Sequence, residues 1–197
     1  MWGVKGIELL SDGQTPSNAL KTLRRSDKGQ SQRQVHMIDS SGTTGAHTGS
    51  DCVGWAGHLC KNAISVAGNM LDSSDVIEAM MASYQNNRKL NFADRLLAAM
   101  QAGELAGGDK RGRQSASLTI HRGESFPWID LRSDDHDAPL DEIERLLSVA
   151  RERYVFFTEL MGSSDNFSGV ADRTQIDEAI AKAAEERIKN GRQTSSR

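Results

Sequence analysis

Apolar positions with helical spacing occur in two early and two middle segments of the chain. Residues 3–25 carry apolar positions three or four apart around a Ser-Asp-Gly break, which predicts two short helices. Asp75 and Asn91 can cap two further helices, the second of which is expected to end at Gly103. The apolar stripes expected on these two helices are Val76, Met80 and Tyr84, and Phe92, Leu96 and Met100.

Shorter segments between the helices predict β-strands. Apolar and polar residues alternate there, and turn residues such as Ser40-Ser41-Gly42 separate neighbouring segments, as in hairpins. Residues 50–61 contain Gly and Cys and are expected to be irregular. This order favours an α+β fold of antiparallel sheets covered by helices. The predicted strands are residues 34–39, 43–49, 62–68, 114–121 and 126–132.

The C-terminal third is predicted to be mainly helical. From Leu140 to Met161 the apolar positions keep helical spacing, which indicates one long helix. Residues 162–172 are rich in Gly, Ser and Asp, and residues 173–190 carry a thin apolar stripe. We therefore expect a domain over residues 1–161, followed over residues 162–197 by a linker, a helix and a disordered tail.

Composition narrows the classes of function. With 197 residues, 37% hydrophobic residues and a net charge of −3, the chain can bury a core but has no bias toward nucleic acid or an anionic membrane. No apolar run approaches the roughly 18 residues of a membrane span, and the start lacks the pattern of a signal peptide. A cytoplasmic protein is expected, with Cys52 and Cys60 as free thiols.

Three polar segments are candidates for chemistry. Asp134-Asp135-His136 can bind a cation or form an Asp-oriented histidine base, or it can be a turn that caps a helix near Pro139. The loop of residues 107–115 can wrap an anion or stay a solvated basic loop. Asn69 can donate its amide to an oxyanion, or it can be a turn residue.

Two histidines and two cysteines also fall within fourteen residues. They are His47, Cys52, His58 and Cys60. Their spacing matches no common zinc pattern, so neither a metal nor another cofactor is predicted. A Cys–His nucleophilic pair is conceivable, but nothing near Cys52 indicates the lowered thiol pKa that it needs.

Several short motifs follow one another in a specific order along the chain. They are Gly6-Ile7-Glu8-Leu9-Leu10, Ala19-Leu20, His47-Thr48-Gly49, Trp55-Ala56-Gly57-His58, Gly68-Asn69-Met70-Leu71, Phe92 to Ala99, Ala102-Gly103-Glu104, Gly107 to Ala116, Asp130-Leu131-Arg132 and Asp134-Asp135-His136. This order resembles the domain-of-unknown-function family ten-twenty-eight over about residues 3–160. The resemblance implies a four-layer αββα sandwich of the Ntn-hydrolase superfamily, whose terminal Thr, Ser or Cys attacks an amide and uses its own α-amine as base.

These motifs also supply the candidate site residues. Asn69, Asp135 and His136 are expected to act in catalysis. The residues expected to bind substrate are His47, Asp109, Arg111, Gln114 and Arg132. One shared cleft is predicted to contain Asn69, Asp109, Arg111, Arg132, Asp135 and His136.

Two departures from the family pattern affect the expected activity. The family usually opens with two strands and a nucleophile, whereas this chain begins Met1-Trp2, and Ala67 stands where the family usually has Gln. The chain is therefore expected to lack Ntn-type activity by itself. Missing strands would expose sheet edges, which favours marginal stability or a homo-oligomer.

The sequence is consistent with three functions. The first is an Ntn-type amidohydrolase-family protein acting on a small amide or a cell-wall-derived substrate. The second is a non-catalytic protein that binds a small molecule or a peptidoglycan fragment. The third is a metal-dependent hydrolase that uses Asp134, Asp135 and His136.

Overall fold

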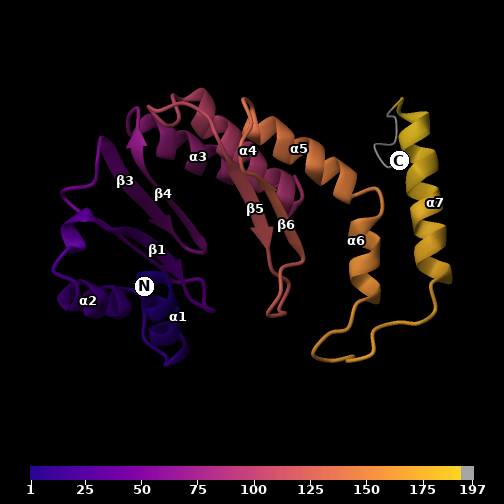
Figure 1. The fold of residues 1–197 in the computed structure, drawn as a ribbon, viewed down its shortest axis with the longest axis horizontal. Coiled ribbons are helices and arrows are strands. Elements are labelled where there is room, and N and C mark those ends of the chain that lie inside the picture. The colour runs from indigo at the N-terminus through magenta and orange to yellow at the C-terminus, as the bar shows by residue number, and fades with distance from the viewer. Residues whose placement is uncertain (192–197) are drawn as a thin grey trace. The chain divides into compact units, whose positions relative to one another are not determined.

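The computed structural model describes residues 1–191, which form two compact units (Figure 1). The first unit is Met1–Gly112 and the second begins at Arg113. Antiparallel two-stranded sheets and helices make up both units, so the predicted α+β class with antiparallel pairing is confirmed. Most of the tail predicted to be disordered lies outside the described residues.

Two helices cover the first hairpin of unit 1. They are α1 (Trp2–Ser11) and α2 (Pro16–Ser26), and Thr15 caps α2 by accepting a hydrogen bond from the Asn18 amide. A short 3-10 helix, η1 (Gln30–Gln32), leads into β1 (Gln34–Ile38), which pairs with β2 (Thr44–Thr48). The helices bury Leu9, Ala19 and Leu23 together, and Met37 of β1 packs against this cluster.

A second hairpin is covered by the next helix pair. It consists of β3 (Trp55–Lys61) and β4 (Ile64–Leu71), with a register shift between Trp55 and Gly57. Val66 of β4 packs with Ile77 and Met81 of α3 (Asp75–Asn86). Helix α4 (Phe92–Leu105) packs along α3, and Asn91 caps it as predicted.

The two hairpins of unit 1 pack face to face. Strands β1 and β2 contact β4 and β3, while α1 and α2 lie on one outer face and α3 lies on the other (Figure 1). Side chains alternate along a strand, so Val35 and Met37 point to the opposite side from Gln34 and His36. The polar side of β1 therefore faces the second hairpin.

Unit 2 is a hairpin covered by a helix, with a helical extension. Strands β5 (Ala116–Ile120) and β6 (Ile129–Ser133) pair antiparallel, and α5 (Pro139–Ala150) packs on them. The most buried side chains are Ile129, Ile143 and Leu147. The chain continues through α6 (Tyr154–Phe157), η2 (Thr158–Leu160) and α7 (Thr174–Lys189).

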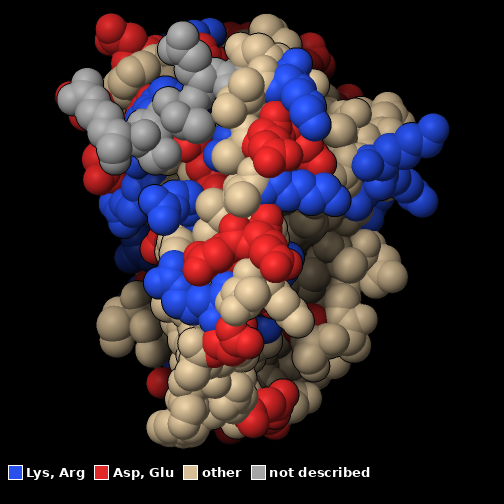
Figure 2. Space-filling view, turned by 90° about the vertical axis from the view of Figure 1, so that its right-hand side faces the viewer, with Lys and Arg blue, Asp and Glu red and all other residues tan. Residues whose placement is uncertain are grey.

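The surface on the side of α7 carries charges of both signs. Figure 2 shows acidic and basic side chains interspersed over this face, with fewer charges toward its lower end. None of the described helices is both long enough and apolar enough to cross a membrane.

Residues 50–54 are irregular as predicted, but residues 55–61 of the segment predicted to be irregular form strand β3. Its side chains alternate between Leu59, which packs near α3, and His58 and Cys60 on the other side. Gly57 has no side chain, and His58 and Cys60 are polar, so the usual strand signal is weak.

The predicted stripe of α4 was also wrong. Phe92 and Met100 are 53% and 45% exposed, whereas Ala93, Leu97 and Gly103 are buried. Gly103 does not end the helix, which continues to Leu105. It packs closely on α3, where a Cβ at position 103 would lie 2.6 Å from Cγ of Met80. On α3, the predicted stripe of Val76, Met80 and Tyr84 is only partly correct, because the buried residues are Val76, Ile77 and Met81. The predicted cap was wrong, because the side chain of Asp75 does not cap the helix.

The long helix predicted from Leu140 to Met161 is broken. Helix α5 ends at Ala150 and α6 begins at Tyr154. The backbone amide of Glu152 bonds to the Val149 carbonyl, three residues back, which tightens the last turn and stops the α-helical ladder. The side chain of Glu152 is almost fully buried at this break.

Candidate functional site

A layer of polar side chains lies between the two hairpins of unit 1. Facing sheets usually bury apolar side chains against each other, but here hydrogen bonds cross between the hairpins. The layer is therefore a candidate site instead of an ordinary core. We use the name polar layer for Gln34, His36, Thr48, His58, Cys60, Ser65 and Asn69.

Gln34 is the centre of the polar layer. Its Nε2 lies within hydrogen-bond distance of three acceptors: the carbonyl oxygens of Gly57 at 3.0 Å and Gly68 at 2.8 Å, and Oγ1 of Thr48 at 3.0 Å. The two hydrogens of the amide are shared among these three oxygens. Carbonyl oxygens can only accept, so the amide nitrogen of Gln34 must face them and its Oε1 must face Asn69. Nδ2 of Asn69 then donates to that Oε1 at 2.9 Å.

The chain of hydrogen bonds continues from Thr48 to His58. Oγ1 of Thr48 lies 2.8 Å from Nδ1 of His58. Oγ1 of Thr48 can accept from Gln34 and still donate its own proton to His58. With this direction, Nδ1 of a neutral His58 is the acceptor and the ring proton is on Nε2, and this tautomer is the one that we propose.

The surroundings of His58 favour the neutral imidazole. Partial desolvation in the polar layer lowers the pKa of His58 below its usual range, although part of the side chain is exposed, and the nearby His47 and His36 lower it further. At neutral pH, His58 thus offers an Nε2–H donor instead of a positive charge.

The series of hydrogen-bonded side chains in the polar layer ends at Asn69 and at His58, and each of these offers a hydrogen-bond donor. Asn69 keeps one amide hydrogen beyond the one given to Gln34, and His58 presents Nε2–H. His58 pairs with Ala67 in the β3–β4 register, so Asn69 is its diagonal neighbour on the same face. Such neighbours lie about 7–8 Å apart, within reach of one ligand. Both side chains are exposed, so a carbonyl oxygen or oxyanion can accept from them.

Protonation of His58 gives a pH-dependent prediction. Because the pKa of His58 is lower in the folded protein, the unfolded chain binds a proton at a higher pH than the folded protein does. The stability that neutral His58 contributes is therefore complete above the pKa of the unfolded chain and is lost as the pH falls below it. We expect the urea midpoint to rise as the pH is raised toward about 6.5, the pKa of a histidine in the unfolded chain. His36, whose pKa is also lowered by burial, contributes to the same rise. His58→Gln should flatten this rise, whereas His121→Gln in unit 2 should leave it intact. A variant slope equal to that of the wild type would contradict the assignment.

The other members of the polar layer form a smaller group. Nδ1 of His36 lies 2.9 Å from Oγ of Ser65, and Sγ of Cys60 lies 3.5 Å from the same oxygen. Cys52 and Cys60 are both free thiols. Within residues 1–191, no three His, Cys, Asp or Glu side chains converge on a point that could hold a metal ion.

The basic loop after α4 lies against the end of β4. The Lys110 amide bonds to the Met70 carbonyl, and Asp109 forms a bridge with Leu71. Arg111 donates to both carboxylate oxygens of Asp109, at 3.0 and 2.7 Å, which lowers the pKa of Asp109. The loop thus places Asp109 and Arg111 next to the strand of Asn69, with the two charges paired to each other.

His47 lies on the other side of β2 from Thr48. Its Nε2 is 2.8 Å from the Gln30 carbonyl, and its ring contacts that of Trp2 with centroids 5.5 Å apart. His47 thus faces η1 and α1, and a role for it in binding substrate stays a prediction.

The Asp-His segment of unit 2 lies between β6 and α5. Arg132 donates to Oδ1 of Asp134 at 2.8 Å, and Asp135 is exposed. Nδ1 of His136 accepts from the Ala138 amide, and the His136 amide bonds to the Gln114 carbonyl. No carboxylate caps α5, so the predicted capping by Asp side chains was wrong. These residues are not grouped as metal ligands in the described structure.

The predicted shared cleft would join residues of both units and stays a prediction. Asn69, Asp109 and Arg111 belong to unit 1, whereas Gln114, Arg132 and the Asp-His segment belong to unit 2. The sequence interpretation missed Gln34 and Thr48 as site residues. The available signal was the alternation of Gln34 and His36 with Val35 and Met37 along β1.

Comparisons with known proteins place the chain among relatives of undetermined activity. A family model described as "Family of unknown function (DUF1028)" matches residues 1–143. The crystal structure of protein SPO2555 from Silicibacter pomeroyi, assigned to the same family model, is similar with a TM-score of 0.78 and 29% identity. That match covers 87% of this chain and 76% of the other. A comparison with curated proteins finds no significant match.

Proposed function

The chain belongs to the DUF1028 family, and from its polar layer we propose that it is an Ntn-type amidohydrolase-family protein that binds a small amide between its two hairpins. The observation that carries the proposal is the series of hydrogen-bonded side chains that runs from Asn69 through Gln34 and Thr48 to His58. The order of helices, hairpin, hairpin and helix in unit 1 supports the αββα sandwich that the resemblance implies.

The chemistry of the polar layer favours an amide carbonyl over a charged group. Its members are Gln, Thr, Asn, Ser and Cys side chains and histidines with lowered pKa, so it offers neutral donors and no fixed cation. Neutral donors held by other hydrogen bonds suit an oxygen that becomes more negative during acyl transfer. Asn69 and His58 fit this role because Gln34 and Thr48 hold them in place.

Binding and turnover are separate expectations. Thr48 is internal, so its α-nitrogen is part of a peptide bond and cannot serve as the base of Ntn chemistry. The polar layer therefore supplies binding and polarisation of the carbonyl, while turnover needs a terminal Thr, Ser or Cys. The alternative function is that of a non-catalytic binding protein. Such a protein would bind the same amides as the proposed amidohydrolase but would hydrolyse none of them.

The test is calorimetric binding of two amides, N-acetylalanine amide and muramyl dipeptide, to the 197-residue chain. Asn69→Ala is expected to weaken binding about tenfold, the effect of losing one good hydrogen bond. The matched control is Asn62→Ala, because Asn62 is an exposed residue in the turn between β3 and β4. Equal affinity of wild type and Asn69→Ala, or no binding of either amide, would sink the proposal.

The same samples test for amide hydrolysis. Because Thr48 has no free α-amine, no turnover is expected from the polar layer itself. Hydrolysis that disappears in Asp135→Ala or His136→Ala would instead favour a mechanism at the Asp-His segment of unit 2.

A further inference from the structure

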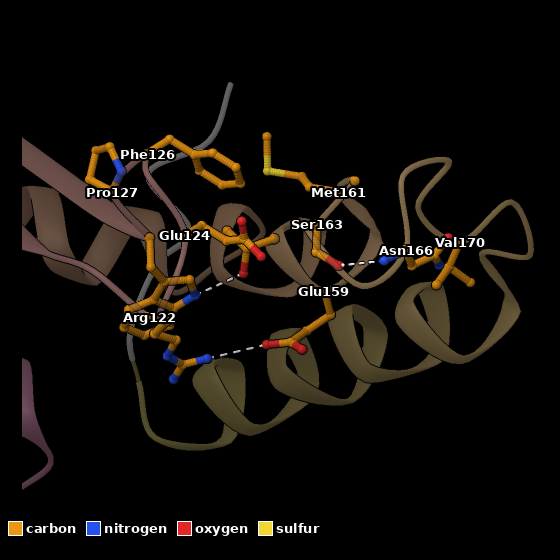
Figure 3. Close-up of a pocket in the computed structure, with 12 residues that line it drawn as sticks. Arg122, Glu124, Phe126, Pro127, Glu159, Met161, Ser163, Asn166 and Val170 are labelled. Atoms are coloured by element: carbon orange, nitrogen blue, oxygen red, sulfur yellow. Dashed lines mark hydrogen bonds and ion pairs between the residues drawn. The ribbon is translucent and has the colours of Figure 1, made fainter.

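Unit 2 contains a cleft that is separate from the polar layer. It has a volume of about 340 Å³ and lies between the tip of the β5–β6 hairpin and the chain that follows α6 (Figure 3). Its size is at the lower end of the range of small-molecule sites. Residues after position 143 form one wall, so this wall lies outside the part of the chain that matches the family.

Hydrogen bonds tie the two walls of the cleft together. Nε1 of Trp128 donates to Oγ1 of Thr158 at 2.9 Å. The amide and the hydroxyl of Ser164 both donate to Oε1 of Glu124 at 2.9 Å. The cleft is therefore formed by the fold of unit 2 and not by a loose loop alone.

One carboxylate in the cleft has no cation beside it. Arg122 stacks over the ring of Trp128, 3.5 Å from its centroid, and pairs with Glu159 at 3.3 Å. The carboxylate of Glu124 accepts hydrogen bonds from Ser164, and no ion pair joins it to a Lys, Arg or His among the described residues. One cation and two carboxylates line the cleft, so one negative charge remains uncompensated.

Apolar side chains surround this carboxylate. Phe126, Met161 and Val170 line the cleft and are 43%, 51% and 47% exposed, respectively. Figure 3 shows Glu124 reaching into the cleft near Phe126 and Met161, with the Arg122–Glu159 pair on its other side. An apolar group on these side chains would lie next to the carboxylate of Glu124.

We propose that this cleft binds a small amphipathic amine, with its ammonium group on Glu124 and its aryl or alkyl group on Phe126 and Met161. A charge-assisted hydrogen bond to a half-buried carboxylate is stronger than one between neutral groups. The aromatic face of Phe126 adds to the attraction for a cation, whereas the ring of Trp128 already carries the Arg122 guanidinium. An anion of the same shape meets the net negative charge and is repelled.

Three probes with the same phenyl group and different charges test the proposal. Phenethylamine, 2-phenylethanol and 3-phenylpropanoate are titrated at neutral pH into the ¹⁵N-labelled chain, and the shifts of the unit 2 amides are followed. Phenethylamine is expected to bind at least about tenfold more tightly than 3-phenylpropanoate, with the alcohol between them. An affinity of 3-phenylpropanoate equal to that of the amine, or no binding of any probe at about 10 mM, would overturn the proposal.

Two variants separate charge from packing. Glu124→Gln keeps an oxygen that can accept from Ser164 but removes the charge, so it should weaken the amine about tenfold and leave the alcohol unchanged. Phe126→Ala should weaken all three probes. The matched control is Glu178→Gln, because Glu178 is an exposed residue on α7. Unchanged amine binding in Glu124→Gln would refute the role of the carboxylate, whatever the outcome for amides at the polar layer.

Discussion

Replacing Gly49 with alanine is expected to destabilise the protein by about 3 kcal/mol or more, because the backbone must move to admit a methyl group. A Cβ at this position would lie 2.0 Å from the carbonyl oxygen of Ser31 and 2.7 Å from that of Gln30. Neither atom belongs to a side chain that could turn away. Urea unfolding of the full chain measures the loss.

A glycine in open surroundings provides the control for Gly49→Ala. Gly3 lies in α1, and a Cβ there would meet nothing within 4 Å. Gly3→Ala should therefore stabilise the protein by about 0.5–1 kcal/mol through the higher helix propensity of alanine. A tolerated Gly49→Ala would show that η1 does not pack on the end of β2 as described.

Replacing Gln34 with alanine is expected to cost about 2 kcal/mol of stability and to abolish amide binding at the polar layer. The substitution removes the donor to the carbonyls of Gly57 and Gly68 and to Thr48, and it removes the acceptor of Asn69. The two hairpins then lose their central link, and Asn69 is no longer held. Urea unfolding and calorimetry measure the two effects.

The control for Gln34→Ala is the same change at Gln32. This residue lies two positions earlier, in η1, and is exposed. Gln32→Ala should leave both stability and amide affinity nearly unchanged. Equal effects of the two substitutions would mean that Gln34 is only a surface residue, and the polar layer would lose its organising group.

The hairpins could be predicted from the sequence, but it could not be predicted that their polar faces pack against each other instead of facing solvent. Turn residues and alternation located β1 and β2 to within about a residue. A polar residue that alternates with apolar ones is normally assigned to solvent, as for Gln34 and His36. Here that face packs on a second hairpin, a contact between segments more than twenty residues apart that local patterns do not report.

Helix α4 shows a different limit of sequence patterns. Phe92, Leu96 and Met100 form an apolar stripe, but Ala93 and Leu97 offer a second one on the neighbouring face. The helix buries its small residues because α3 passes close by, as the contact of Gly103 with Met80 requires. Residue size at a helix contact, and not hydrophobicity alone, decides which face is buried.

The most direct test of the polar layer is a ¹H–¹⁵N NMR titration of the full chain with N-acetylalanine amide at pH 7.5. We expect His58 to carry its proton on Nε2, and we expect this signal and the side-chain amide of Asn69 to shift together with one dissociation constant. Signals of Gln32 and His121 should stay in place. Protonation of His58 on Nδ1, or shifts that avoid both Asn69 and His58, would contradict the claim that these two donors bind an amide carbonyl.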